Sequence, residues 1–412
     1  MYNFFLYPYT HVSVKNGAFI YNTLNNEYIE DNSPEVSKFI GELLDSSVSC
    51  IKVDQNLLDK KNINKFVNKV RDSYAGDLVE ASKEDTSPVQ LIEELKIHKN
   101  NEAVDKTDLG VEILDYFNNC LLYINSECDK KCKDCGEMFK QFAFCKKNKC
   151  GTQIELHILK DLVNTLSGLG IQDIQISGGD LFAYPFLKDF FLYVRENNIN
   201  PTFLINQKHI THHSELLIVE EMAGFNIKLL VNDLDFYVSN SSFIQKVLKQ
   251  TNVSYQFTIE TESEINKLEA ISETLAEANV EIAAFHNNNS DFFKEMVYIT
   301  KDDLFEENHS LNSIFSNKAI NKNFFGSLII NCDLKVYSSF NKPRLGTIGE
   351  DSFQELIYKE ISNISTWKLT RDHLPVCKNC NYCFLCPAPS NYELILNRSN
   401  LCHIAFDTSK IT

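Results

Sequence analysis

The chain lacks a surplus of basic residues. Its 412 residues include 40 lysines and arginines but 56 aspartates and glutamates, which gives a formal net charge of -16. This charge argues against a large phosphate-binding surface and therefore against nucleic acid as a partner or substrate. A peptide or a small molecule agrees better with the composition.

Long apolar runs are also missing. No run approaches the roughly 20 residues that a membrane-spanning helix needs, and Met1–Phe5 form no basic targeting segment. We therefore expect a cytoplasmic protein with no membrane partner. Since 43% of the residues are hydrophobic, the chain can bury a sizeable core and should divide into two or three domains.

Cysteine, in contrast, is plentiful. The 13 cysteines are clustered and odd in number, which favours metal or iron–sulfur ligation in a reducing compartment over a disulfide framework. Cys50 and Cys120 lie apart from the clusters and are expected to be small buried hydrophobic residues. Cys145 and Cys150 lie on a basic segment, and the sequence assigns them no role beyond the option that one completes an auxiliary metal site.

The first cysteine cluster has the spacing C-x3-C-x2-C, formed by Cys128, Cys132 and Cys135. Three thiolates on one tight loop can bind three irons of a [4Fe-4S] cluster and leave the fourth iron open to another ligand. A zinc-binding loop or three unpaired thiols are the alternatives for this motif taken alone. Asp134 adds negative charge next to the last cysteine and would disfavour a reduced cluster.

Between Cys120 and about His286, short β-rich runs alternate with stretches of helical length. The expected strands are 121–125, 171–177, 202–205, 227–231, 253–259 and 280–285. Successive βα units predict a parallel sheet in an open or partial barrel, with ligands at the carboxyl ends of the strands. The cysteine loop follows the first strand and should lie at that edge.

A second motif, made of Ser177, Gly178, Gly179 and Asp180, follows the second expected strand. Adjacent glycines let the backbone approach a ligand closely, and a carboxylate can bind an ammonium group. An ordinary βα turn is the alternative. In combination, the two motifs resemble the radical S-adenosylmethionine (SAM) superfamily. The resemblance implies that SAM chelates the open iron through its amino and carboxylate groups. It also implies that this motif, with Asp180 in place of the usual Glu, binds the SAM amino group. Catalytic residues remain unknown.

A further cysteine group lies near the C-terminus and comprises Cys377, Cys380, Cys383, Cys386 and Cys402. Successive C-x2-C steps followed by proline are typical of ferredoxin-type cluster loops, and a four-thiolate zinc site is the alternative. With Cys332 and Gly346 upstream, this region resembles a SPASM domain, the auxiliary-cluster extension of radical peptide maturases.

The SPASM resemblance implies at least one auxiliary [4Fe-4S] cluster, with the ligands Cys377, Cys380, Cys383 and Cys402. Cys332 and Cys386 would remain from a second auxiliary site. Its expected second cysteine is missing, and Asp351, Cys145 or Cys150 would have to complete it.

The first 80 residues have a different pattern. Three short strands at 10–14, 18–21 and 28–30 are expected before two helices. The first helix should start at Ser33-Pro34, and the apolar faces of the two helices are Val36, Phe39, Ile40, Leu43 and Leu44, then Ile63, Phe66, Val67 and Val70. The arrangement resembles a winged-helix-like domain that binds a leader peptide as an added strand. A plain packing domain is the alternative.

The chain as a whole resembles a radical SAM/SPASM peptide maturase for precursors with double-glycine leaders, a group with pseudo-radical relatives. The implied α/β fold is a partial (βα)6 barrel at 119–300, with a peptide-recognition domain at 1–80, a linker and connecting helix at 81–118, and a SPASM-like domain at 301–412. The implied reaction is hydrogen abstraction from a precursor peptide, leading to a crosslink, thioether or epimer, with an external electron donor.

Two alternatives to this function stay open. One is a non-catalytic subunit that binds leader peptide or a sister maturase. The other is a protein-activating radical enzyme, which would not need residues 1–80.

Overall fold

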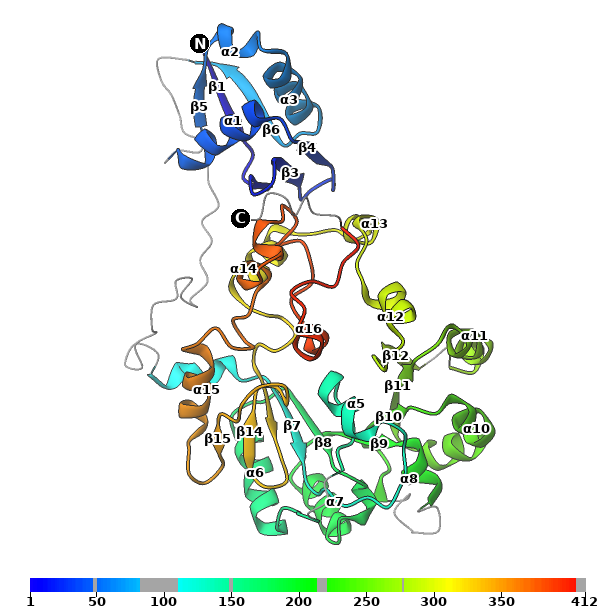
Figure 1. The fold of residues 1–412 in the computed structure, drawn as a ribbon. Coiled ribbons are helices and arrows are strands. Elements are labelled where there is room, and N and C mark those ends of the chain that lie inside the picture. Colours follow the sequence, from blue (N-terminus) through cyan, green and yellow to red (C-terminus); the bar gives the residue numbers. More distant parts are fainter. Residues whose placement is uncertain (47–49, 82–109, 148–150, 213–220, 276–277, 405–412) are drawn as a thin grey trace.

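The computed structural model describes residues 1–46, 50–81, 110–147, 151–212, 221–275 and 278–404. An N-terminal domain lies at one end of the molecule and a wide sheet at the other, with C-terminal segments between them (Figure 1). The expected linker after Glu80 lies almost entirely outside the described residues.

The main sheet has nine strands in the order β12-β11-β10-β9-β8-β7-β13-β14-β15. Strands β7 to β13 are parallel, whereas β14 and β15 are antiparallel additions at one edge. The bounds are β7 Asn119–Tyr123, β8 Asp173–Ser177, β9 Thr202–Asn206, β10 Asn226–Val231, β11 Asn252–Ile259, β12 Asn279–Ala284, β13 Ser327–Ile330, β14 Lys335–Tyr337 and β15 Gly346–Thr347.

All six strands predicted for this region are confirmed, with ends displaced by two residues or fewer. The sheet also continues past residue 300, because β13 pairs with β7 at its open side. The sequence did not predict this extension.

Helices alternate with the strands, as the βα pattern predicted. They are α5 Cys135–Gln141, α6 Leu156–Gly168, α7 Leu187–Glu196, α8 Gln207–His212, α10 Leu234–Leu248 and α11 Glu262–Ile271, with a 3-10 turn at Leu181–Ala183. Leu159, Leu162, Val163 and Leu166 of α6 are buried in the largest hydrophobic core. Their spacing of three and four residues places them on one helix face.

Helix α5 packs on the opposite face of the sheet. Met138 of α5 shares a small core with Leu204 and Leu230, whereas the neighbouring residues Phe203 and Leu229 point into the large core. Since successive side chains of a strand point to opposite faces, the cysteine loop and α5 lie on the inner face.

The N-terminal domain contains two small antiparallel sheets. One has the order β2-β3-β4 and the other β5-β1-β6. The bounds are β1 Tyr2–Leu6, β2 Thr10–Ser13, β3 Ala18–Asn22, β4 Tyr28–Asp31, α1 Pro34–Asp45, β5 Cys50–Val53, α2 Gln55–Leu58, α3 Lys61–Asp72 and β6 Gly76–Glu80.

The three strands and two helices predicted for this domain are confirmed. Strands β1, β5 and β6 were missed, because their pairing joins short segments that are far apart in sequence. Two burial predictions were wrong. Leu44 is 45% exposed, so the apolar face of α1 ends at Leu43, and Cys50 is only half-buried at the start of β5.

The remaining segments connect the sheet to the N-terminal domain. They comprise a 3-10 helix at Gly110–Tyr116, α12 Ser290–Val297, α13 Lys301–Glu306, α14 Leu311–Ala319, α15 Phe353–Ile361, 3-10 turns at Arg371–His373 and Cys377–Asn379, and α16 Asn391–Leu396. Phe19 and Tyr21 of β3 pack with Leu304, Ile314 and Leu385 in a shared core.

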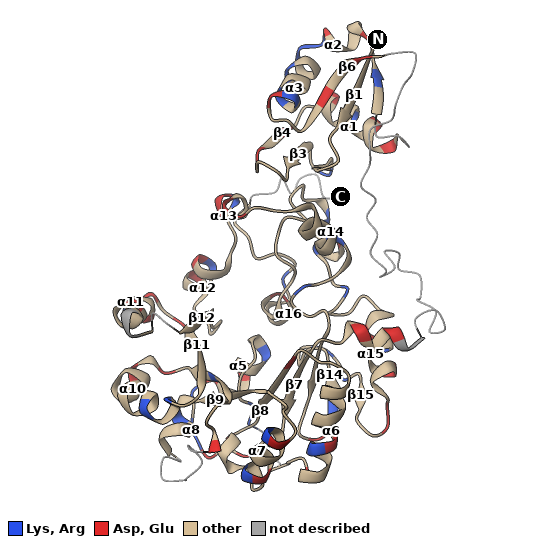
Figure 2. Cartoon of the chain, turned by 180° about the vertical axis from the view of Figure 1, so that it is seen from behind, with Lys and Arg blue, Asp and Glu red and all other residues tan. Residues whose placement is uncertain are grey.

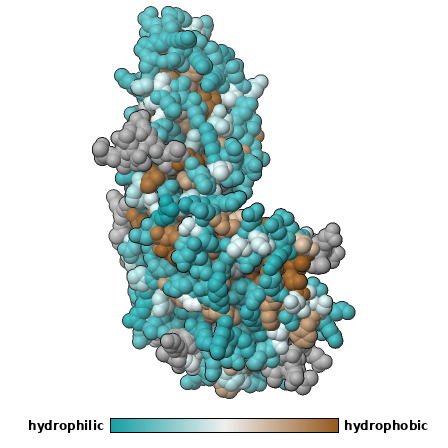
Figure 3. All heavy atoms as spheres, turned by 45° about the vertical axis from the view of Figure 1, so that its right-hand side comes forward, coloured by the Kyte–Doolittle hydropathy of each residue, from teal (hydrophilic) through white to brown (hydrophobic). Residues whose placement is uncertain are grey.

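Basic and acidic residues are mixed along several of the described elements (Figure 2). The face drawn in Figure 3 is mostly hydrophilic, with separate hydrophobic patches. None of the described helices is long and apolar enough to cross a membrane.

Candidate functional site

The cysteine loop runs from the carboxyl end of β7 to α5. Asp134, immediately before the helix, adopts a left-handed backbone conformation with φ of 55°. Cys128, Cys132 and Cys135 are all half-buried. Burial raises the pKa of Cys128 to about 11, with smaller contributions from Asp180, Cys132 and Cys135. The three thiols therefore lie close enough to act on one another electrostatically.

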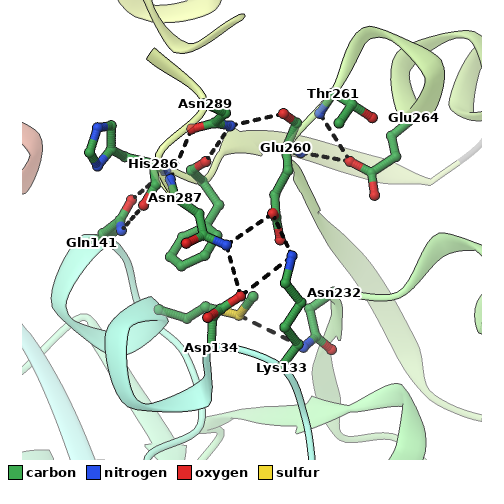
Figure 4. A network of polar contacts seen from close by, with 12 residues as sticks. Lys133, Asp134, Gln141, Asn232, Glu260, Thr261, Glu264, His286, Asn287 and Asn289 are labelled. Atoms are coloured by element: carbon green, nitrogen blue, oxygen red, sulfur yellow. Dashed lines mark hydrogen bonds and ion pairs between the residues drawn. The ribbon is translucent and has the colours of Figure 1, made fainter.

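A polar network fixes this loop to the ends of β11 and β12 (Figure 4). Asn287 donates from Nδ2 to Asp134 Oδ2 at 2.9 Å. Lys133 Nζ lies 3.6 Å from the Asp134 carboxylate and 2.9 Å from that of Glu260. The negative charge of Asp134, which the sequence presents as a liability for a reduced cluster, is thus partly balanced and anchors the loop.

Cys145 is a site residue that the sequence left without a role. It is 4% exposed and lies in the small core under α5 with Met138, Leu204 and Leu230. An interaction with the Cys145 thiol lowers the pKa of Cys135 to about 6. Cys150 lies outside the described residues.

The Ser177–Asp180 motif leaves the carboxyl end of β8, next to the cysteine loop. A Cβ on Gly178 would lie 1.9 Å from Asn125 Oδ1, and one on Gly179 would lie 2.3 Å from the Glu127 carbonyl oxygen. Both glycines are therefore required for close approach to the segment that leads into the loop. Asn125 also donates to the Asp180 carbonyl oxygen at 2.7 Å.

Asp180 is buried and points toward His209. Its Oδ1 accepts from the Phe182 backbone at 3.1 Å and lies 3.7 Å from His209 Nδ1. The other ring nitrogen, Nε2, lies 3.6 Å from Cys128 Sγ. His209 therefore joins the two predicted motifs. Sequence reasoning missed it, although its position just after β9 could have signalled it.

The C-terminal cysteines also come together. Cys377, Cys383 and Cys402 all interact electrostatically with Cys380, and burial raises the pKa of Cys380 to about 12. Cys386 belongs to the same group, since Cys380, Cys377 and Cys402 act on it. The group therefore has five thiols. Four of them were predicted to hold one auxiliary cluster.

A buried ion pair lies among these thiols. Arg371 lies 2.7 Å from Glu393 and donates to the Pro387 carbonyl oxygen at 2.7 Å. Arg371 also acts on the charges of Cys377 and Cys386. A guanidinium at this position favours the thiolate forms that metal binding requires.

Cys332 lies in a different place. Its thiol interacts with Ser126 and Lys146, near the end of β7. The Asp351 carboxylate accepts from the Thr347 backbone at 3.0 Å and pairs with Lys359 at 2.6 Å. The structure therefore groups Cys386 with the other C-terminal cysteines and places Cys332 beside the first cysteine loop.

The arrangement of these thiols limits which kind of metal site they can form. Within the described ranges, no three His, Cys, Asp or Glu side chains are arranged as ligands of one metal ion. A [4Fe-4S] cluster takes one thiolate on each iron, so its ligands do not share an ion. The half-buried thiols of the first loop and the buried or half-buried thiols of the C-terminal group fit that donor chemistry, and Arg371 supplies positive charge to the second group.

The inner face of the sheet also contains a cavity of about 270 Å³. Leu121 and Gln175 line it from β7 and β8, Ile329 lines it from β13, and Phe139 and Phe340 lie across from the strands. The cavity could admit part of a substrate side chain.

Fold and site together define an α/β protein with a cysteine-rich loop at the carboxyl edge of a mostly parallel sheet. No known family and no curated protein matches the chain. Its structure is similar to that of Streptococcus suis SuiB bound to precursor peptide SuiA, at 12% identity over 97% of this chain and 100% of that chain, with a TM-score of 0.43. It is likewise similar to SuiB bound to S-adenosylmethionine, at 12% identity over 98% and 99% of the two chains, with a TM-score of 0.42. An identity of 12% with TM-scores below 0.5 does not establish a function, so the function depends on the residues of this chain.

Proposed function

We propose that this chain is a radical SAM enzyme that modifies a ribosomally made precursor peptide by hydrogen abstraction. The observation that carries the proposal is the meeting of two motifs at one edge of a parallel sheet. The Asp180 backbone donates to the Glu127 carbonyl oxygen at 2.6 Å, directly before Cys128. Ligands of parallel α/β sheets bind at this edge.

The cysteine loop would hold the cluster that the reaction needs. A [4Fe-4S] cluster on Cys128, Cys132 and Cys135 would supply one electron for the reductive cleavage of SAM. Lys208 lies close enough to Cys132 to favour its thiolate, and the Asp134–Asn287 contact holds the loop in place. Ser177, Gly178, Gly179 and Asp180 would bind the SAM amino group, for which Asp180 has to turn from His209.

The C-terminal region would hold at least one auxiliary [4Fe-4S] cluster of the SPASM type. Cys377, Cys380, Cys383 and Cys402 are its proposed ligands, and Cys386 lies beside them. Cys332 would serve a separate site near the first loop. The buried Arg371 would offset the negative charge of the auxiliary thiolates.

The N-terminal domain would bind the leader of the precursor. In the described part of the chain, β5 and β6 each pair only with β1, so each has an edge that can take up an extended peptide. Asn381, between two auxiliary cysteines, accepts from the Asn16 backbone at 3.0 Å. The N-terminal domain therefore contacts the segment that carries the auxiliary cysteines.

The test is anaerobic reconstitution with iron and sulfide, followed by dithionite, SAM and a precursor peptide. An enzyme should release 5'-deoxyadenosine and change the peptide mass. Cys132→Ala should abolish both, and Cys50→Ala should retain both. A short neighbouring reading frame with a double-glycine leader would supply the precursor. Wild-type protein that carries a loop cluster but releases no 5'-deoxyadenosine would contradict the proposal.

A non-catalytic partner protein is the second candidate. The observation that favours it is that Asp180 interacts with His209 and the Phe182 backbone, while both glycines pack against Asn125–Glu127. Such a subunit would bind leader peptide or a sister maturase through residues 1–80. Peptide binding without SAM cleavage would favour this function.

A further inference from the structure

The cavity on the inner face of the sheet lies beside the proposed reaction site. Phe139, which lines the cavity, follows Cys135 by one turn of α5, so the two side chains lie about 6 Å apart on one face of the helix. We propose that this cavity binds a tyrosine side chain of the precursor peptide. The inference rests on the proposed function and names a feature of its substrate.

The first argument is the size and shape of the cavity. Leu121 of β7 lies opposite Gln175 of β8 and Ile329 of β13, so these side chains form one continuous floor. The Phe139 and Phe340 rings line the other side, with centroids 5.2 Å apart at an angle of 86°. The volume of about 270 Å³ is just below the range of about 300–1,000 Å³ for small-molecule pockets. It therefore suits one side chain and not a longer segment.

The second argument is that the cavity offers no unpaired charge. Among the described residues that line it, Lys140 alone is charged, and its Nζ donates to both Glu137 carboxylate oxygens at 2.9 and 3.0 Å. Lys146 lies nearby over the Phe340 ring, but its Nζ donates to Asn331 at 3.0 Å. A charged peptide side chain would lose its water in this cavity without gaining a partner. The occupant should therefore be neutral.

The third argument is the pair of amide side chains in the lining. Gln175 donates from Nε2 to Asp173 Oδ2 at 2.6 Å, which leaves its Oε1 as an acceptor. Asn391 Oδ1 accepts from Ser339 Oγ at 2.8 Å and from Asn341 Nδ2 at 3.0 Å, which leaves Asn391 Nδ2 as a donor. A phenol hydroxyl both donates and accepts, whereas an indole only donates and a phenyl ring does neither. Tyrosine therefore matches both amides.

The experiment measures the binding of side-chain analogues to full-length, anaerobically reconstituted protein by isothermal titration calorimetry. The analogues are p-cresol, toluene and 3-methylindole, which represent tyrosine, phenylalanine and tryptophan. Wild type is compared with Gln175→Leu, which removes the acceptor, and with Ile329→Phe, which fills the cavity. Ile364→Phe is the matched control, because Ile364 is 40% exposed on the surface.

Wild type should bind p-cresol about tenfold more tightly than toluene, the ratio expected from one buried hydrogen bond. Gln175→Leu should bind the two analogues about equally. Ile329→Phe should bind p-cresol about tenfold or more weakly than wild type because the added ring occupies the space, and Ile364→Phe should match wild type. If Ile329→Phe fails to fold, Gln175→Leu decides the question, because a changed preference between two analogues does not depend on filling the cavity.

The same comparison is then made with the precursor. Each precursor tyrosine is changed to phenylalanine, and the binding of labelled peptide is measured by fluorescence anisotropy. One of these changes should weaken binding to wild type about tenfold and should weaken binding to Gln175→Leu much less, because the two changes remove the same hydrogen bond. A precursor without tyrosine, or changes that weaken binding to both proteins equally, would overturn the inference.

The outcomes separate this inference from the proposed function. Equal binding of p-cresol and toluene to wild type, tightest binding of 3-methylindole, or unchanged p-cresol binding by Ile329→Phe would overturn the tyrosine assignment, and release of 5'-deoxyadenosine by the same protein would leave the proposed function standing. Tyrosine-dependent precursor binding without release of 5'-deoxyadenosine would overturn the radical chemistry and support the role of the cavity.

Discussion

Asp134 and Asn287 are separated by 153 positions and joined by a hydrogen bond of 2.9 Å. Asp134 turns the cysteine loop into α5, and Asn287 lies just beyond the end of β12. The contact therefore connects the loop after β7 to the end of β12, a strand at the edge of the sheet. It holds the loop across the inner face of the sheet.

Removing this contact should loosen the loop. Asn287→Ala leaves the Asp134 carboxylate with Lys133 alone, and we expect unfolding in urea to lose about 1 kcal/mol of stability. Reconstituted protein should also lose iron faster during gel filtration. Asn68→Ala, on the exposed face of α3, should change stability by less than about 0.5 kcal/mol. Equal losses in both variants would contradict the anchoring role.

The buried ion pair in the C-terminal region should be important for stability. Arg371→Ala leaves the Glu393 carboxylate buried without its partner, which costs about 3–5 kcal/mol. Urea unfolding of the metal-free protein measures this loss. Arg398→Ala is the control, because Arg398 contacts Tyr298 on an exposed surface, and it should cost less than about 1 kcal/mol. If Arg371→Ala loses less than about 1 kcal/mol of stability, water reaches the Glu393 carboxylate in the variant.

The start of α10 should be sensitive to acid. Asp233 accepts from the Phe236 backbone at 3.1 Å and pairs with Lys208 at 2.7 Å. Burial tends to raise the pKa of Asp233, but the contacts with Lys208 and Phe236 outweigh it, so the net pKa lies below the ordinary value of 3.8. The stabilisation is therefore present above the unfolded-state pKa and is lost as the pH falls through the lower folded-state pKa.

Asp233→Ala should accordingly cost about 1 kcal/mol at pH 7. The difference from wild type should shrink toward zero as the pH falls below about 3.8. Urea unfolding of wild type and Asp233→Ala at a series of pH values measures this difference in stability. Asp235→Ala, an exposed acid on the same helix turn, should show a smaller effect. A stability difference that grows on acidification would contradict the stabilising role of the ionised Asp233 carboxylate.

The contact between the N-terminal domain and the auxiliary cysteines should depend on Asn381. Its side chain accepts from Ser13 Oγ at 3.1 Å and donates to the Asn16 carbonyl oxygen at 2.6 Å. Asn381→Ala should speed limited proteolysis between the domains several-fold, because these hydrogen bonds are lost. Asn379→Ala, exposed on the same segment, should be cleaved like wild type. Unchanged cleavage of Asn381→Ala would contradict a role of these hydrogen bonds in holding the domains together.

Local patterns in the sequence determined much of this protein. Alternating apolar runs predicted the six strands between Asn119 and Ala284, because side-chain periodicity depends only on neighbouring residues. The spacing of Cys128, Cys132 and Cys135, placed after the first strand, likewise predicted their position at the carboxyl edge of the sheet.

Only the tertiary structure decided which distant residues meet. The pairing of β13 with β7, and the position of His209 between Cys128 and Asp180, depend on the order of the strands and on the face of the sheet to which their side chains point. These contacts follow from packing over long sequence separations. No local pattern encodes them, because each residue alone is compatible with many partners.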